Sequence, residues 1–402
     1  MNAHDPMLAR TEERQAVRGF RLRERTAAIL GIVCFALMIA VPPVVGMFRD
    51  NDIETLERRK AAAFPGLPQS SRQFRRWPRR VDTFLNDHLG WRDEMILANG
   101  SLRYALGTSA ARTEVARADN VVFRLSSDIL EQYRGTRRYR RGTVLNRTAD
   151  DIARIGDLAA EWGGTFLMTV APNKITVYGP EDAPKWLNGS VVQRSAQLRQ
   201  MSRAMRKRLG ENFIGSLATL NRWKDIGPLY SAYGTHWDEL GAFFSYDRIM
   251  QRIAALDPSA RPYELDRFVV RRTQTNHDTG NARVMGLMNV LLNDYAFVKP
   301  RKRNAKLEEA WRVIKRRTGA ESQSYRYVNP SCSECPSLLV LGDSFSLRWH
   351  SMFPESFREV VFMHHQRGRF DPNEVRRFKP DFVLLELVEQ QLARKWHPPK
   401  LD

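Results

Sequence analysis

The sequence predicts an α/β protein with a parallel sheet flanked by helices, preceded by one membrane-spanning helix. Apolar runs of strand length occur at residues 165–170, 338–341 and 381–387, and helical patterns separate them, which is typical of a parallel sheet. Residues 26–48 contain no charged side chain, and these 23 residues are enough to cross a bilayer as a helix. The chain of 402 residues, 43% of them hydrophobic, is long enough to bury a sizeable core.

The residues before the apolar stretch predict its orientation. Residues 1–25 hold six arginines, and a bias toward lysine and arginine marks the cytoplasmic end of a span. We therefore expect residues 1–25 in the cytoplasm and everything after Phe48 on the other side of the membrane. A cleaved secretory signal is the alternative, but the length of the apolar stretch favours an uncleaved signal anchor.

The exported part is strongly basic. The net charge is +19 at pH 7, and residues 1–48 contribute only +2 of it. Basic runs lie at residues 134–141, 299–303 and 315–317. Because nucleic acid is not expected outside the cytoplasm, the charge favours an anionic polysaccharide or a negatively charged membrane surface as partner. A basic solvated surface without a partner is the alternative for any single run.

The three cysteines do not predict a metal site. Cys34 lies inside the apolar stretch, and Cys332 and Cys335 alone cannot complete a zinc site. In an oxidising compartment this pair is expected to form a local disulfide or to remain as free thiols, rather than to act in redox catalysis. No motif for a cofactor or a metal is predicted.

Local patterns predict the order of the elements. Residues 49–110 are expected to form a linker followed by a helical region, interrupted at Gly90, in which His88 is structural. Residues 257–330 are polar and predict an irregular insertion over the site. Within the main domain, residues 111–402, the expected strands are 120–125, 165–170, 338–341, 359–363 and 381–387, and the expected helices are 149–162, 191–209 and 241–256.

Two segments predict a nucleophile and its base. Ser344 stands in the glycine turn 342–346, directly after the apolar strand 338–341, and α/β folds place their chemistry at the carboxyl ends of strands. Serine needs a neutral imidazole to activate it, and His236 in residues 233–237 is the candidate base. The alternative is that the turn merely caps a helix and the histidine is packed.

Other residues are candidates for supporting roles. Asp343 is expected to orient the nucleophile turn or to cap a helix. Lys174 and Tyr178 follow the strand 165–170 and are expected to line the cleft, where the Asn173 amide would offer a hydrogen bond to an oxyanion. A turn is the alternative for residues 172–173.

These segments, in this order, resemble the SGNH hydrolase-like O-acetyltransferases of bacterial exopolysaccharide export, the AlgJ and AlgX type of alginate acetylation. The base motif precedes the nucleophile motif in that family, which is a circular permutation of the usual SGNH order. The landmarks in this chain are residues 87–93, 172–174 with Tyr178, 235–237 with Gly241, 342–345 and 379–389.

The resemblance implies an O-acetyltransferase of an exported polysaccharide, anchored in the bacterial inner membrane by a single pass with its main domain in the periplasm. Ser344 would take the acetyl group with His236 as base, and a sugar hydroxyl would then attack the acyl-serine. A membrane-bound acyltransferase partner would supply the acetyl groups. An esterase that uses the same residues is a rival hypothesis, because the motif does not show whether sugar or water attacks.

One position departs from the family pattern. The family carries its triad aspartate two residues before the histidine, where this chain has Gly234. Three explanations compete: a surrogate acid such as Asp238 or Asp278, a working Ser–His dyad, or a domain that has lost catalysis and serves as a glycan-binding or scaffold subunit of an export complex. For Asp238 the alternative is a cap of the helix that follows Trp237. Without an orienting carboxylate, the imidazole loses control of its tautomer.

Overall fold

The computed structural model describes residues 6–57, 59–107, 114–118, 121–125, 142–182, 196–314, 321–365 and 370–392. The basic runs 134–141 and 315–317 and the start of the expected helix 191–209 lie outside these residues. The chain divides into two compact units, Met1–Leu102 and Arg103–Asp402.

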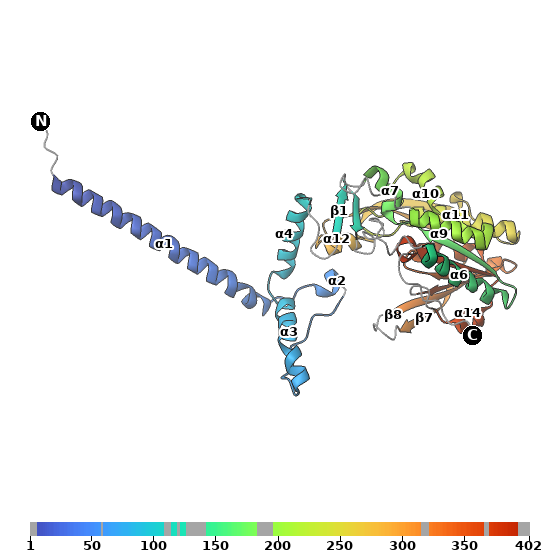
Figure 1. Ribbon diagram of the computed structural model, residues 1–402, viewed down its shortest axis with the longest axis horizontal. Helices are drawn as coiled ribbons and strands as arrows, with labels where there is room; N and C mark the ends of the chain where they lie inside the picture. Colours follow the sequence, from blue (N-terminus) through green and yellow to red (C-terminus); the bar gives the residue numbers. More distant parts are fainter. Residues whose placement is uncertain are drawn as a thin grey trace. The chain divides into compact units, whose positions relative to one another are not determined.

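The first unit is helical. Among the described residues, Arg25–Gly46 is the stretch that is long and apolar enough to cross a membrane, with a mean hydropathy of 2.6. It forms the second half of one continuous helix, so the predicted apolar helix is present and ends two residues earlier than expected. The helices are α1 (Pro6–Gly46), α2 (Ile53–Glu57), α3 (Ser71–Asp87) and α4 (Arg92–Ala105). Figure 1 shows α3 and α4 leaving the end of α1 in opposite directions.

The turn between α3 and α4 packs against the end of α1. The N–H of Gly90 donates to the carbonyl oxygen of Pro42 at 2.9 Å. A side chain at Gly90 or at Gly46 would overlap backbone atoms of the other segment, so two glycines permit this close approach. His88 has the structural role expected, since its Nδ1 lies 2.9 Å from the carbonyl oxygen of Phe84.

The second unit is built on a seven-stranded sheet of order β4-β3-β11-β9-β10-β8-β7. The first five strands run parallel, and β8 and β7 add to one edge in antiparallel pairing. This parallel-rich α/β fold is the one predicted. The strands are β3 (Thr165–Ala171), β4 (Phe213–Gly215), β7 (Lys306–Ile314), β8 (Glu321–Val328), β9 (Ser337–Gly342), β10 (Glu359–His364) and β11 (Phe382–Val388).

Two buried layers hold helices to the two faces of this sheet, because side chains alternate along a strand. On β9, Leu339 and Leu341 pack with α6 (Gly142–Ala160) and α9 (Ala196–Leu209). Leu338 and Val340 face the other way and pack with α11 (Glu239–Leu256). The central strand is therefore buried on both sides, which explains its uninterrupted apolar sequence.

The expectation of an irregular insertion at residues 257–330 is wrong. This segment contains β7 and β8 and a separate antiparallel hairpin, β5 (Phe268–Thr275) with β6 (Asn293–Pro300), whose connection includes α12 (Gly280–Val284). Val269 and Val270 on β5 are exposed, so the hairpin lacks the apolar run that identified the core strands. Edge and surface strands need no such run, and the sequence pattern therefore did not predict them.

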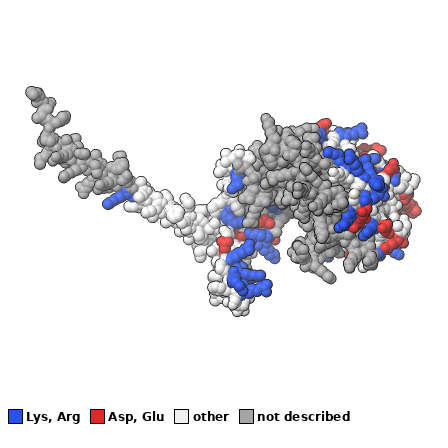
Figure 2. Space-filling model, viewed as in Figure 1, with Lys and Arg blue, Asp and Glu red and all other residues white. Residues whose placement is uncertain are grey.

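The remaining elements are short. Cys332 and Cys335 are joined in a disulfide just before β9, which is one of the two states expected for them. Figure 2 shows Lys and Arg side chains gathered over the first unit near α3 and over parts of the second. The short elements are β1 (Glu114–Ala118), β2 (Val121–Leu125), α7 (Lys174–Asp182), α10 (Leu217–Trp223), α13 (Phe353–Ser356), α14 (Pro372–Phe378) and α15 (Glu389–Leu392).

Candidate active site

His236 lies between a hydroxyl and a carboxylate. Its Nε2 is 2.8 Å from Ser344 Oγ, and its Nδ1 is 2.7 Å from Asp278 Oδ1. With Asp278 ionised, the N–H group is at Nδ1 and donates a hydrogen bond to the carboxylate. Nε2 of the imidazole can then accept a hydrogen bond from the serine hydroxyl. Ser344, His236 and Asp278 therefore form one hydrogen-bonded chain of hydroxyl, imidazole and carboxylate.

The turn after β9 positions Ser344. Asp343 accepts the N–H of Phe345 through Oδ1 at 2.9 Å and the N–H of Val388, on β11, through Oδ2 at 2.8 Å. Its own N–H donates to Glu386 Oε2 at 2.9 Å. The carboxylate of Asp343 thus ties the nucleophile turn to the neighbouring strand, and the orienting role expected for it stays a prediction.

A second buried acid lies beneath this turn. Burial, followed by the charge of the neighbouring Asp343, raises the pKa of Glu386 well above its ordinary value. A protonated Glu386 adds no negative charge of its own beneath the nucleophile turn. Glu386 is the one charged residue of β11, and this interruption of the apolar run was the available signal for it.

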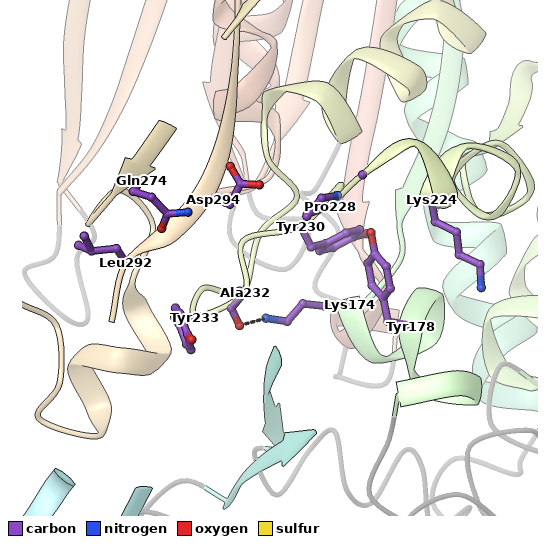
Figure 3. A pocket seen from close by; sticks show the side chains of 11 residues that line it. Lys174, Tyr178, Lys224, Pro228, Tyr230, Ala232, Tyr233, Gln274, Leu292 and Asp294 are labelled. Carbon is purple, nitrogen blue, oxygen red and sulfur yellow. Dashed lines mark hydrogen bonds between the residues drawn. The ribbon is translucent and has the colours of Figure 1, made fainter. Parts of the chain in front are cut away.

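Backbone contacts hold the loop that carries His236. Trp237 is fully buried, and its indole N–H donates to the carbonyl oxygen of Phe345 at 3.0 Å, so the base motif is tied to the nucleophile turn. Lys174 Nζ donates to three carbonyl oxygens of the same loop, those of Ser231, Ala232 and Gly234, at 2.7–2.9 Å. Figure 3 shows one of these bonds. Burial lowers the pKa of Lys174 to about 7.

Asp278 comes from the connection between β5 and β6. Its φ of 54° lies in the left-handed region, where aspartate is tolerated better than most residues. Burial acts to raise its pKa, but His236 and then Arg348 outweigh burial and bring the pKa to about 2. Arg348 Nη2 is 3.6 Å from Asp278 Oδ1. The carboxylate is therefore ionised throughout the neutral range.

Gly234 lies directly against Asp278. A side chain at position 234 would overlap both the backbone carbonyl and the carboxylate of Asp278. An aspartate side chain at position 234 would therefore need the space that the carboxylate of Asp278 fills. Asn281 braces the same position, because its amide donates to the carbonyl oxygen of Gly234 at 2.9 Å.

Asp238, the other surrogate considered, has a different place. Its carboxylate caps α11 by accepting the N–H of Gly241 at 2.8 Å, and it also accepts the N–H of Ala296 at 3.3 Å. Burial raises its pKa to about 7. The expectation that Asp238 supports the histidine is therefore replaced by a role at the start of α11, where the geometry of an N-cap holds it.

Asn173 lies at the carboxyl end of β3. Its backbone N–H donates to Glu389 Oε2 at 2.8 Å, and Thr176 Oγ1 donates to the same oxygen at 2.6 Å. Burial raises the pKa of Glu389 to about 7. The side-chain Nδ2 of Asn173 is buried and, among the described residues, has no hydrogen-bond partner. A buried amide without a partner is a donor available to a bound group.

A pocket of about 610 Å³ borders the histidine loop. Figure 3 shows tyrosines, Gln274 and Asp294 converging on it from α7, the loop after α10 and the β5–β6 hairpin. Ser344 does not line the pocket, but Ala232 and Tyr233, just before Gly234, do. Among the described residues, no group of three or more His, Cys, Asp or Glu side chains is arranged to hold a metal ion.

Neither a protein-family model nor a curated protein sequence matches this chain. Solved structures match it in three dimensions: PatB1 of Bacillus cereus is 12% identical, over 71% of this chain and 100% of PatB1, with a TM-score of 0.51. In fold, the chain resembles PatB1. A DHHW family protein from Eubacterium siraeum is 14% identical, over 73% of this chain and 98% of its own, with a TM-score of 0.49. The O-acetyltransferase domain of Pseudomonas putida AlgJ is 15% identical, over 71% and 94%, with a TM-score of 0.43.

Within this PatB1-like fold, the sequence predicted part of the site. It indicated Ser344 and His236 as a pair, and the structure brings them together across 108 positions of sequence. It left Asp278 as one of two surrogate acids and did not indicate Arg348, Glu386 or Glu389. The combination of a glycine at the family's acid position and an aspartate in a polar loop was the available signal for Asp278.

Proposed function

We propose that this protein is an O-acyltransferase that moves acetyl groups onto hydroxyls of an exported bacterial polysaccharide. One observation carries the proposal: Ser344, His236 and Asp278 form a continuous hydrogen-bonded chain at the carboxyl end of the central strand. The fold shared with PatB1 and the order of base before nucleophile support it. The charge and the apolar helix support a location at the inner membrane with the main domain in the periplasm.

The proposed mechanism is a double displacement. Ser344 Oγ attacks the acetyl carbonyl of the donor while His236 Nε2 takes the serine proton, and the imidazolium then protonates the departing donor group. A sugar hydroxyl next gives its proton to His236 and attacks the acyl-serine. The imidazolium returns this proton to Ser344 Oγ as the serine–acyl bond breaks, which releases the O-acetylated sugar and restores neutral His236. Asp278 holds the imidazole in the tautomer that both steps require and stabilises the imidazolium.

Developing negative charge on the acetyl carbonyl requires a donor. The buried Asn173 amide, which lacks a partner among the described residues, is our candidate for part of the oxyanion hole. Lys174 lines the pocket, as Tyr178 does, and its three bonds to loop carbonyls give it a role in holding the histidine loop. We place the acceptor glycan in the pocket beside Tyr233, whose aromatic and polar lining suits a sugar chain.

The acetyl donor is expected to come from a membrane-bound acyltransferase partner. An inner-membrane anchor would keep the domain next to such a partner, and an exported net charge of +17, out of the chain's +19, would keep an anionic glycan close. The domain boundaries we propose are the anchor at residues 26–48, the helical region at residues 49–110 and the catalytic domain at residues 111–402.

Covalent labelling tests the nucleophile without knowing the glycan. PatB1 has been solved with a sulfonyl adduct, so we propose treating the detergent-solubilised full chain with phenylmethylsulfonyl fluoride and measuring intact mass. We expect one sulfonyl group on Ser344, none in Ser344→Ala and strongly slowed labelling in His236→Ala. A folded chain that is not labelled would favour the scaffold hypothesis.

A second assay separates transfer from hydrolysis. The chain is given 4-nitrophenyl acetate with and without an oligosaccharide acceptor, and acetylated sugar and free acetate are quantified by mass spectrometry. If the chain is a transferase, acetylated sugar should form faster with the parent than with Ser344→Ala. Acetate alone, at a rate that the acceptor does not change, would point to an esterase.

A further inference from the structure

Helix α3 is divided into an apolar side and an arginine side. At about 100° per residue, Phe74, Val81 and Leu85 fall in one narrow sector, and five arginines fall on the opposite half of the helix. Phe74 is 66% exposed and Leu85 is 58% exposed. All of the arginines, Arg72, Arg75, Arg76, Arg79 and Arg80, are exposed. A helix with this division and with an open apolar side is typical of a membrane interface.

Neighbouring residues enlarge the apolar side. Phe64 contacts Phe84 edge to face, and the indole N–H of Trp77 donates to the carbonyl oxygen of Gly66 at 3.1 Å, so the segment before α3 packs on the same side of the helix. Phe64 is 65% exposed and Leu67 is 84% exposed. Monomeric proteins rarely leave large contiguous apolar patches in water, and such a patch marks an interaction surface.

The end of α3 is fixed to the end of the apolar helix. Gly90, three residues beyond α3, donates to Pro42 in the last turns of α1, and neither Gly90 nor Gly46 has room for a side chain. Asp87, the last residue of α3, is buried and accepts both a two-pronged contact from Arg59 and the N–H of Ala62. If α1 crosses a bilayer, its last turns lie at the headgroup level, and the C-terminal end of α3 lies at that level too.

Charge identifies the surface that suits α3. An anionic polysaccharide would pair with the arginines but would leave Phe74, Leu85 and Leu67 in water. A bilayer with anionic lipids satisfies both sides, because the apolar side enters the acyl region while arginine side chains reach phosphates with their charged ends. The lipid surface is also the one already next to α3 through the Gly90–Pro42 contact.

We propose that α3 lies in the lipid–water interface of the membrane crossed by α1, with Phe74 and Leu85 in the acyl region and its arginines at anionic headgroups. The inference rests on the proposed anchoring of α1 and is independent of the chemistry at Ser344. The helix then acts as a second membrane contact, parallel to the surface, for the unit that follows the anchor.

Site-specific fluorescence in the full-length protein tests this placement. Cys34 is the cysteine outside the Cys332–Cys335 disulfide, so Cys34→Ser leaves no free thiol in the chain. Single cysteines are then introduced as Phe74→Cys, Leu85→Cys, Arg76→Cys and, within α1, Ala36→Cys, and are labelled with nitrobenzoxadiazole. Each variant is reconstituted in vesicles of phosphatidylcholine with phosphatidylglycerol, with and without doxyl-labelled lipid.

We expect the probes at positions 74 and 85 to be blue-shifted and to lose most of their fluorescence to doxyl lipid, as the probe at position 36 does. The probe at position 76 should keep its fluorescence. Positions 74 and 85 behaving like position 76, while position 36 is quenched, would overturn the inference and leave the anchor intact. An unquenched probe at position 36 would overturn both, and neither result bears on labelling of Ser344.

The arginines are tested by a matched pair of triple variants. Arg75→Gln, Arg79→Gln and Arg80→Gln together should weaken quenching at position 74 in vesicles with phosphatidylglycerol. The control changes Arg203, Arg222 and Arg261, which are exposed on the second unit, to Gln and should leave quenching unchanged. Equal quenching in both triple variants would overturn the electrostatic part of the proposal.

Discussion

The carboxylate of Asp278 occupies the space that a side chain at position 234 would need. The two positions lie in different loops, yet only one of them can hold an acid next to His236. The glycine at position 234 leaves room for the carboxylate of Asp278, which reaches Nδ1 of His236 from the β5–β6 connection.

Removing the charge of Asp278 should impair chemistry without unfolding the protein. Asp278→Asn keeps the shape but can stabilise the wrong tautomer of His236. In a serine protease, changing the triad aspartate to asparagine lowers kcat by about 10⁴, and we expect a loss of about 10²–10⁴ in the rate of Ser344 sulfonylation at pH 7. The rate is measured by intact mass, with thermal unfolding as the control for folding; an unchanged rate would mean that a Ser–His dyad suffices.

Exchanging the two positions should reconstruct the family arrangement. Gly234→Asp alone forces an overlap with Asp278 and should abolish labelling. Adding Asp278→Gly removes the overlap and also relaxes a residue with φ of 54°, which glycine adopts without cost. Ser344 of the double variant should therefore be sulfonylated faster than Ser344 of either single variant. If the rate losses of the two single variants simply add in the double variant, positions 234 and 278 do not compete for the same space.

The buried Glu389 should make stability depend on pH. Its pKa is about 7 in the folded chain against an ordinary 4.5, so the folded chain holds the extra proton between these values, and stability falls as pH rises through this window. Glu389→Gln can still accept the hydrogen bonds from Asn173 and Thr176 but carries no charge. The stability of Glu389→Gln relative to the parent should therefore increase between pH 4.5 and pH 8, by up to about 3 kcal/mol in the free energy of unfolding. Unfolding temperatures measured across this range check it, and a stability difference that does not change with pH would contradict the assignment.

Lys174 should prove structural. Lys174→Met removes one donor from three loop carbonyls. Those of Ser231 and Gly234 keep the N–H of Gly234 and the amide of Asn281, whereas the Ala232 carbonyl loses the Lys174 bond, and an unsatisfied buried group costs about 1–3 kcal/mol. We expect a lower unfolding temperature together with slower labelling of Ser344, because the loop that carries His236 loosens. Lys224→Met, which removes a lysine from the pocket lining, is the matched control and should change neither quantity.

The pocket should affect the acceptor and not the nucleophile. Tyr233→Ala is expected to raise the KM for an oligosaccharide acceptor while leaving sulfonylation of Ser344 within about twofold, since the pocket does not include the serine. The measurement compares acceptor dependence of acetyl transfer with the labelling rate. If acetyl transfer and the rate of Ser344 labelling fall by the same factor, Tyr233 instead stabilises the loop that carries His236.

The core strands, and Ser344 and His236 as separate candidates, were predictable because each stands in a recognisable local segment. Their pairing across 108 positions was inferred from the base that a serine nucleophile requires, not from a local pattern. β9 is apolar along its length since both of its faces are covered, and the serine turn follows it directly. The β5–β6 hairpin was not predictable from apolar runs, because Val269 and Val270 on it face solvent. Asp278 sits at the end of that hairpin, so its contact with His236 depends on a docking event that no local pattern encodes.

The pairing of Asp278 with His236 joins residues 42 positions apart, and the pairing of His236 with Ser344 joins residues 108 positions apart. Loop closures of this kind form only when distant parts of the chain have met. In a partly folded chain Ser344 would lack both His236 and Asp278. Under the proposed function, the serine therefore becomes reactive only after the second unit has folded, so unfinished molecules would not consume acetyl donor.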